Sequence, residues 1–373
     1  MAATLEPARA EPRERFAAVV DAEVLPRAAE FDRAGAIPGD VLRLAAHEGW
    51  WGAAVAGQDW RTVGALHEEV GRGCSSLRSL LTVHTMVAWA VRRWGSEAQQ
   101  ARWLGVLRSG EVLGAFCLTE PEAGSDAAAI ETAAVTSGDG FVLEGTKVWV
   151  TGGQVAGLFL VFARSERGLA AFLVPHGTPG LEVVPIEGAL GTRASMLAQV
   201  SLSGCRVGPE ALLGPDGFGL ATVATGALDV GRYSVACGCV GIVQACLDAS
   251  AEHAAARQRG GAPIADRQLV RRMLSDMVVD VRAARLLCVE AGRLKDDDDP
   301  ATIMATWVAK YHASRAAARA AADAVQIHGA AGCAEGHRAG RLYRDAKVME
   351  IIEGSTQLQQ LTIADDAFRG RRP

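Results

Sequence analysis

The sequence predicts an α+β protein in which a small β-domain separates two helical domains. Three observations along the 373 residues support this class. Apolar residues recur at helical spacing up to about residue 112, short β-prone runs follow, and helical spacing returns from about residue 219. We therefore expect an N-terminal α-helical domain at 1–113, a middle antiparallel β-domain at 114–218 and a C-terminal α-helical bundle at 219–373.

The composition fits a soluble globular protein. With 49% hydrophobic and 22% charged residues, the chain can bury a sizeable core. Its longest apolar runs are interrupted before the roughly 20 residues that a membrane-spanning helix needs. The opening MAATLEPARAEPRERF lacks the apolar core of a secretory signal. We expect a cytoplasmic protein with no membrane partner.

Charge and cysteine content argue against two further classes. The net charge of −5, with acidic and basic residues interspersed, argues against nucleic-acid binding. The eight cysteines form no C-x-x-C pair and no Cys/His zinc spacing, so we expect reduced, buried thiols and no metal site.

Spacing predicts the helices of both helical domains. Apolar residues within 41–45 fall on one helical face, and Leu269, Met273, Met277 and Val281 repeat every four residues as one buried stripe. The order α, β, α lacks the alternation of a doubly wound fold, and no G-x-G-x-x-G follows a strand. A nucleotide cofactor must therefore be held without a Rossmann turn. We expect the acidic run 296–299 to be a solvated loop.

The first motif with chemical content is AFCLTEPEAGSDAA at 115–128. Its polar turn contains Gly124 and Ser125, which let a backbone approach a bulky anionic group and offer N–H and hydroxyl donors for a phosphate. Taken alone, this stretch is better explained as an ordinary surface loop.

The second motif is TKVWVTGG, about 25 residues further on. Trp149 and Thr151 are two residues apart and are therefore predicted to share one face of a strand. An aromatic plane beside a hydroxyl donor suits the face and the N5 edge of an isoalloxazine ring. Core packing is the alternative explanation for Trp149.

In this arrangement the chain resembles the acyl-CoA dehydrogenases. The resemblance rests on L-T-E-P-x-A-G-S-D followed by K-x-W-x-T-G in a β-domain between two helical domains, and it covers nearly the whole chain. Four further segments of the C-terminal domain carry it: 227–248, 255–277, 291–314 and 324–360. It implies an FAD-dependent oxidoreductase that acts on CH–CH groups of acyl thioesters.

The resemblance implies flavin contacts from the β-domain. Phe116, Leu118 and Thr119 would line the flavin, with Thr119 bonding its pyrimidine edge. Ser125, beside Gly124, would touch the FAD pyrophosphate or the pantetheine arm of the substrate. In the second motif, Trp149 would lie against the flavin ring. Thr151 would donate a hydrogen bond near its N5 atom.

The resemblance also implies nucleotide contacts from the C-terminal domain. Arg257, Gln326 and Gly329 would contact the diphosphate and adenosine of an FAD held by a neighbouring subunit. Ser355 and Gln357 would complete the nucleotide site. A homodimer or homotetramer follows from these contacts across an interface.

Glu353 is the predicted catalytic base. It lies at a helix junction beside Gly354, where Ser355 and Thr356 resemble a cap that opens the next helix. By itself, Glu353 could merely neutralise a helix N-terminus. The resemblance favours catalysis: Glu353 would remove the α-proton, its backbone N–H and the ribityl 2′-hydroxyl of FAD would stabilise the enolate oxygen, and hydride would leave the β-carbon for flavin N5.

Some members of the family carry the base on the long helix, just before the Arg of an L-D-x-x-R stretch. That position is Gly231 here, so Glu353 has no competitor, and we assign Asp229 and Arg232, with Ser125, to substrate binding.

The chain also departs from the family at three places. Arg259-Gly260-Gly261 lacks an adenine-stacking aromatic, Gly329 to Cys333 lacks the usual Gly-Gly-x-Gly-Tyr, and the stretch 50–69 near the substrate channel is short.

Substrate and partners remain open in the sequence. A short acyl-CoA is the default, and a compact, Arg-rich chain also resembles the branch that acts on acyl carrier protein thioesters in polyketide extender-unit biosynthesis. The family usually passes its electrons to an electron-transfer flavoprotein. The alternatives are an FAD-dependent oxidase or hydroxylase on the same fold, and a catalytically silent assembly scaffold.

Overall fold

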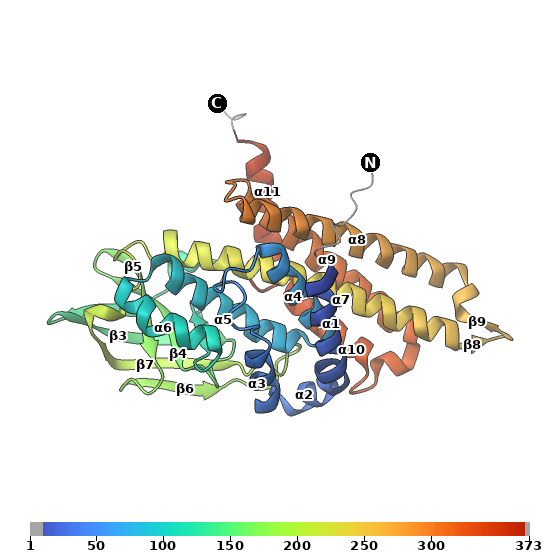
Figure 1. The fold of residues 1–373 in the computed structure, drawn as a ribbon, viewed down its shortest axis with the longest axis horizontal. Coiled ribbons are helices and arrows are strands. Elements are labelled where there is room, and N and C mark those ends of the chain that lie inside the picture. Colours follow the sequence, from blue (N-terminus) through green and yellow to red (C-terminus); the bar gives the residue numbers. More distant parts are fainter. Residues whose placement is uncertain (1–9, 370–373) are drawn as a thin grey trace.

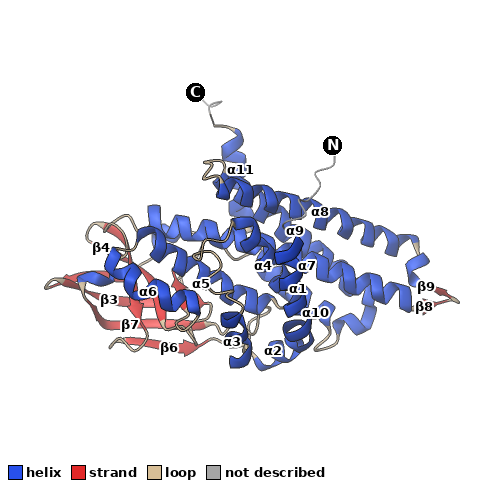
Figure 2. Ribbon diagram, viewed as in Figure 1, coloured by secondary structure: helices blue, strands red, loops and turns tan. Residues whose placement is uncertain are grey.

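The computed structural model describes residues 10–369. The strands of a seven-stranded sheet gather at one end of the molecule, and long helices extend from it to a small hairpin at the other end (Figures 1 and 2). Helices from both ends of the sequence pack together, and the β-domain predicted between them is present.

The N-terminal helices surround one deeply buried helix. They are α1 (Ala10–Val19), α2 (Ala28–Ala34), α3 (Gly39–His47), α4 (Trp60–Gly73), α5 (Ser75–Trp94) and α6 (Glu97–Ser109). Local signals set their ends: Asp59 caps α4 by accepting from Thr62 N at 2.7 Å, and Ser96 and Gln99 form a capping box at α6. Helix α5 is buried along most of its length between α4, α6, α7 and β1.

The sheet divides its side chains between two cores. Its strands are β1 (Gly114–Cys117), β2 (Ala133–Ser137), β3 (Gly140–Val150), β4 (Leu158–Ser165), β5 (Gly168–Pro175), β6 (Leu181–Pro185) and β7 (Ala198–Val207). Along β4, Leu158, Leu160 and Phe162 face the helices, whereas the alternate residues pack among strands. Most pairings are antiparallel as predicted, but β1 and β2 both pair with β4 in parallel.

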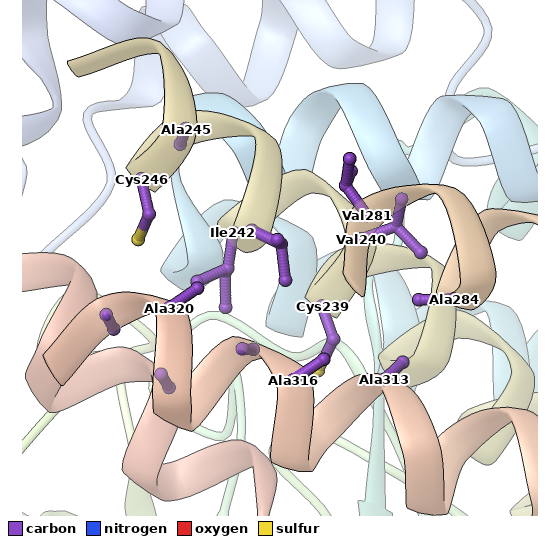
Figure 3. Packing of buried hydrophobic residues seen from close by; sticks show 14 of the residues in the cluster. Cys239, Val240, Ile242, Ala245, Cys246, Val281, Ala284, Ala313, Ala316 and Ala320 are labelled. Atoms are coloured by element: carbon purple, nitrogen blue, oxygen red, sulfur yellow. The ribbon is translucent and has the colours of Figure 1, made fainter. Parts of the chain in front are cut away.

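The C-terminal bundle is built on small residues. It comprises α7 (Thr225–Ala256), α8 (Gln268–Asp296), α9 (Thr302–His328), α10 (Arg338–Met349) and α11 (Thr356–Ala367), with the hairpin β8 (Gln258–Arg259) and β9 (Ala262–Pro263). Ala313, Ala316 and Ala320 on α9 let it approach α7 closely (Figure 3). The helical stretch 220–256 is long and apolar enough to cross a membrane, but most of it is buried inside the bundle.

Two sequence expectations are confirmed only in part. Seven of the eight cysteines are buried free thiols, whereas Cys333 is exposed. On α8, Met277 and Val281 are buried and Met273 packs against the core, but Leu269 is 68% exposed. The predicted stripe is wrong at Leu269, because in the first turn of α8 it is the next residue, Val270, that packs against the core.

Helices α4 and α7 cross in direct backbone contact. A Cβ added at Gly241 would lie 2.6 Å from the backbone N of Arg72, and one at Gly71 would lie 2.7 Å from the carbonyl oxygen of Gly238. No side chain fits between these backbones. The three glycines therefore fix how close α7 lies to the N-terminal helices.

We expect Gly241→Ala to destabilise the protein by about 1–3 kcal/mol, because the new methyl group overpacks this crossing. The matched control is Gly105→Ala on the exposed face of α6, where an added Cβ meets no atom within 4 Å. That change should stabilise the fold by up to about 1 kcal/mol through helix propensity. Urea unfolding of both variants measures the two effects, and equal shifts would contradict the close crossing.

Candidate active site

Glu353 lies in the short junction between α10 and α11. Its backbone is left-handed, with φ of +55°, and Gly354 follows with φ of +94°. Ser355 then caps α11 by accepting from Leu358 N at 3.3 Å, as predicted. A left-handed glutamate is uncommon and is retained only where surrounding contacts hold it.

Two buried cations supply those contacts. Arg232 on α7 donates through Nε to the carbonyl oxygen of Glu353 at 3.1 Å, and its guanidinium stacks 4.1 Å from the ring centre of Trp307. Lys310 on α9 donates to the carbonyl oxygen of Gly354 at 2.8 Å. In this structure Arg232 therefore positions the junction, and its predicted substrate contact stays a prediction.

The carboxylate of Glu353 points into the protein. Its Oε2 atom is buried and has no hydrogen-bond partner among residues 10–369. A Cβ added at Gly231 would lie 2.7 Å from Glu353 Cδ, so the carboxylate fills the space that this glycine leaves. Burial raises the pKa of Glu353, and the charges of Arg232, Lys310 and Arg78 offset only part of that rise. A raised pKa makes the carboxylate a stronger base.

The other predicted substrate residue of the long helix, Asp229, is ion-paired. Its Oδ2 accepts from Lys295, whose ammonium also lies over the rings of Trp60 and Tyr233. Nearby, Asp296 accepts from Trp60 N at 2.6 Å and pairs with Arg61 at 3.0 Å. The expectation of a wholly solvated acidic run is thus wrong at Asp296, which fastens the start of α4 to α8.

The two motifs of the β-domain are held side by side by a buried ion pair. Lys147 is fully buried, and its ammonium donates to Glu120 at 2.6 Å and to the carbonyl oxygen of Leu118 at 3.3 Å. One backbone bond, from Val148 N to Thr119 O at 2.9 Å, joins the same segments. These contacts fix Leu118 and Thr119 beside the strand that carries Trp149.

Glu120 is held from both sides. Besides Lys147, it accepts from the backbone N–H of Glu131 at 2.6 Å and from the N–H and hydroxyl of Thr132 at 2.9 and 2.5 Å. Burial raises the pKa of Glu120, but these hydrogen bonds outweigh burial, so the net pKa is lowered. The ionised pair is therefore a stable part of the fold.

Trp149 departs from the predicted strand geometry. Its φ is +58°, the register of β3 against β7 shifts between Lys147 and Val150, and β3 ends at Val150 before Thr151. The prediction that Trp149 and Thr151 share one strand face is therefore wrong, because a bulge breaks the alternation. Trp149 is 59% exposed, which excludes core packing within this chain as its role.

The β-domain reaches the base through Phe116. This residue packs in a cluster with Met86 of α5 and with Ala227 and Val230 of α7, directly beside Gly231. Gly124 and Ser125 lie in the exposed turn that follows, and a Cβ at Gly124 would meet no atom within 4 Å. A large ligand thus has room at this turn.

Three of the remaining predicted nucleotide contacts, Arg257, Gln326 and Gly329, lie far from Glu353. Arg257 is 26 residues beyond Gly231 on the same helix, or about 39 Å. Gln326 and Gly329 are exposed at the same end, where His253 and His328 stack with ring centres 4.4 Å apart. Gln357 is exposed on the first turn of α11, beside Ser355 at the base.

The departure at Arg259-Gly260-Gly261 has a structural role. Gly260 and Gly261 both adopt positive φ, at +62° and +80°, and form the two-residue turn of the β8–β9 hairpin. The turn replaces an aromatic side chain with a tight backbone loop next to Arg257.

Comparison with known proteins identifies this architecture. The chain matches three domain families: acyl-CoA dehydrogenase N-terminal domain (residues 7–111), middle domain (115–205) and C-terminal domain (217–368). The chain belongs to the acyl-CoA dehydrogenase family.

Individual relatives align with this chain over most of their own length. The mitochondrial short-chain specific acyl-CoA dehydrogenase of Rattus norvegicus is 36% identical over 362 residues, which cover 94% of this chain and 87% of the relative. A solved structure is that of FkbI, a protein for biosynthesis of the methoxymalonyl extender unit of the Fk520 polyketide. It is 38% identical, with a TM-score of 0.88, and the match covers 95% of this chain and 99% of FkbI. A Mycobacterium smegmatis glutaryl-CoA dehydrogenase in complex with FADH2 is 26% identical, with a TM-score of 0.93 and coverage of 97% and 95%.

The cofactor of this acyl-CoA dehydrogenase is FAD. The structure fits a flavin: a large aromatic side chain, Trp149, is held exposed by strained backbone next to Thr119, and the turn at Gly124 leaves open space for a phosphate. The individual FAD contacts remain predictions.

The sequence did not reveal four charged residues of this site. Lys147 and Glu120 were visible inside the motifs, but nothing in their spacing showed that they pair. Lys310 and Arg78 lie in apolar helices, where an isolated cation is the signal that could have found them. Each is located by packing between elements distant in sequence.

We expect Lys147→Met to destabilise the protein by about 3–5 kcal/mol and to weaken FAD retention, because it leaves Glu120 buried without its cation. Adding Glu120→Gln removes the uncompensated charge and should recover part of the loss. Unfolding midpoints and bound-flavin absorbance measure both effects. If the single and double variants were equally stable, the ion pair would not be what holds the two motifs together.

Proposed function

We propose that this protein is an FAD-dependent acyl-thioester dehydrogenase in which Glu353 removes the α-proton of the substrate. The observation that carries this proposal is the buried, unpartnered Oε2 of Glu353, held on strained backbone with a raised pKa. Such a carboxylate is poised to accept a proton rather than to make a structural ion pair. Family membership supports the same role.

The residues of the chain divide the chemistry between them. Glu353 accepts the α-proton, Arg232 and Lys310 hold the junction through its carbonyl oxygens, and the N–H of Glu353 is the proposed donor to the enolate oxygen. FAD, when bound, takes up the β-hydride. The product is a trans-2-enoyl thioester.

The relatives support two candidate carriers of the acyl group. Short acyl-CoA substrates are supported by the short-chain enzyme. A role in polyketide extender-unit biosynthesis is supported by the 38% identity to FkbI, and for that role we propose an acyl carrier protein thioester as the substrate. We further propose a cytoplasmic homodimer or homotetramer that passes electrons to an electron-transfer flavoprotein. Anaerobic flavin bleaching by matched CoA and carrier-protein thioesters decides between the carriers, and reduced enzyme that reoxidises rapidly in air would favour an oxidase instead.

We expect Glu353→Gln to fold and bind FAD but to reduce flavin about 100- to 10,000-fold more slowly with every thioester that bleaches the parent protein. Gln is nearly isosteric and keeps the backbone N–H, so only the base is lost. Stopped-flow flavin absorbance measures the rate. Near-parent reduction by this variant would refute the proposed mechanism.

Exchanging the two facing residues provides the positive control. In Glu353→Gly/Gly231→Glu the new side chain no longer collides with the original carboxylate, and glycine suits the left-handed backbone at 353. We expect this double variant to reduce flavin faster than Glu353→Gly alone. A double variant no faster than Glu353→Gly would argue that position 231 does not face the α-carbon.

A separate variant tests the contact between subunits. Because Arg257 lies about 39 Å along α7 from Gly231, it is too far to serve the flavin beside the Glu353 of its own chain. We expect Arg257→Ala to weaken FAD binding by about 1.5–3 kcal/mol. Arg259→Ala, two residues away in the exposed hairpin, should leave the FAD dissociation constant unchanged. Equal affinity in the two variants would contradict the Arg257 assignment.

A further inference from the structure

Two arginines at the start of α10 lie on one face of the helix without an anion. Arg338 and Arg341 are three residues apart, so their side chains are neighbours on the helix surface. Arg341 is only 6% exposed, and the Nε atom of Arg338 is buried without a hydrogen-bond partner. Among residues 10–369, no carboxylate forms an ion pair with either guanidinium, and neither guanidinium donates a hydrogen bond. No direct contact therefore compensates these two charges.

Two neighbouring arginines, by contrast, are paired. Arg344, one turn further along α10, forms an ion pair with Asp32. Arg72 on α4 forms an ion pair with Glu69 at 2.7 Å. The missing anion is therefore particular to the first turn of α10.

Nearby charges make this position strongly positive. Burial lowers the pKa of Arg338, and the charges of Arg341 and Arg72 lower it further. Asp248 on α7 opposes this effect only at longer range, because its carboxylate makes no ion pair with Arg338 and accepts instead from Gln244 at 2.8 Å. The N-terminal end of a helix adds positive charge of its own, so arginine is unfavourable there. Buried cations in such a place are costly unless an anion is bound.

The carboxylate of Asp345, one turn beyond Arg341, does not supply that anion. Its Oδ1 accepts from Thr192 N at 2.6 Å, on the side of the β-domain. Burial raises the pKa of Asp345 to about 6, and the charge of Arg341 offsets only part of this rise. A direct ion pair would instead hold the pKa of the carboxyl low. Asp345 is therefore not the partner of Arg341.

We propose that Arg338 and Arg341 bind an inorganic oxyanion of the size of phosphate at the N-terminal end of α10. A tetrahedral oxyanion offers enough acceptors for two guanidinium forks, and a helix N-terminus favours negative charge. The burial of Arg341 favours a small ion over a bulky phosphate ester. The inference is independent of the proposed function, because neither arginine takes part in the proposed reaction.

The position differs from the predicted phosphate contacts of FAD. Arg338 lies near Cys246 and Asp248 on α7. Arg257, the predicted diphosphate contact, is nine residues beyond Asp248, or about 14 Å along the helix. An anion at this position would hold the start of α10, which packs against α7 and leads to Glu353. Binding of the anion should therefore stabilise the fold.

The test adds inorganic phosphate to phosphate-free holoenzyme, in which FAD already occupies its own site. We expect isothermal titration calorimetry to show one saturable site per subunit. Phosphate should raise Tm by at least about 2 °C more than sodium chloride of the same ionic strength does. Arg338→Gln and Arg341→Gln should each weaken phosphate binding at least about 10-fold, because each removes a charge-assisted contact. Arg282→Gln, at an exposed arginine of α8, should leave phosphate binding unchanged.

Stability without phosphate gives an independent readout. Because Arg338→Gln removes one of two repelling charges, this variant should be at least as stable as the parent protein in phosphate-free buffer. Phosphate should then raise the Tm of the parent but not that of the variant. A purely structural arginine would behave differently: its replacement would lower Tm and leave the response to phosphate intact, and that result would contradict the site.

Further outcomes count against the inference. No saturable binding by the parent, an equal response to chloride, or equal phosphate affinity in Arg282→Gln and Arg338→Gln would overturn it. So would a loss of FAD affinity in Arg338→Gln as large as that in Arg257→Ala, because the arginine would then belong to the cofactor site. If the parent binds no phosphate and the subunits of the variants separate, a carboxylate of a neighbouring subunit is the anion and the inference is wrong. Should Arg341→Gln fail to fold, Arg338→Gln decides alone.

Discussion

The carboxylate of Glu353 occupies the space that Gly231 leaves on α7, and the surrounding site is arranged around this buried charge. Its Oε2 atom has no hydrogen-bond partner among residues 10–369, and nearby cations offset part of the rise in pKa that burial causes. Arg232 and Lys310 donate to the backbone carbonyl oxygens of Glu353 and Gly354, and Arg78 contributes positive charge from α5. For Arg78 to act on Glu353, α7 must lie close to the N-terminal helices. The glycine crossing of α4 and α7 provides this close approach. The geometry around Glu353 therefore depends on this crossing.

The order of the three regions could be predicted because each is set by a pattern among residues close together in the sequence. The change from period 3.6 to period 2 and back located three regions, and the glycine and serine after residue 353 predicted a helix junction with its cap. The predictions that were wrong concern contacts between residues far apart in the sequence. Asp296 was expected in solvent but bonds to Trp60, 236 residues away in sequence. The bulge at Trp149 arises from pairing with β7, which no pattern within β3 reveals.

Lysine usage is a signal that sequence reasoning left unused. The chain contains 34 Arg and only 4 Lys. Lys147, Lys295 and Lys310 are all buried, each bonded to a carboxylate or a carbonyl oxygen, and only Lys347 is solvated. A compact ammonium fits where a planar guanidinium needs more room and more acceptors. In a chain that otherwise uses arginine, three of the four lysines thus lie at buried positions.

Backbone strain links the proposed flavin face to the base. Five described residues other than glycine have positive φ, and four of them lie along one connected path: Trp149, Thr192, Met196 and Glu353. The turn after Trp149 donates to the carbonyl oxygens of Ser195 and Met196, and Thr192 N donates to Asp345 on α10, the helix that leads to Glu353. Strained residues persist only where neighbours over-determine them. The loop at 192–196 thus connects two strained ends, because its hydrogen bonds join the turn after Trp149 to the helix that leads to Glu353.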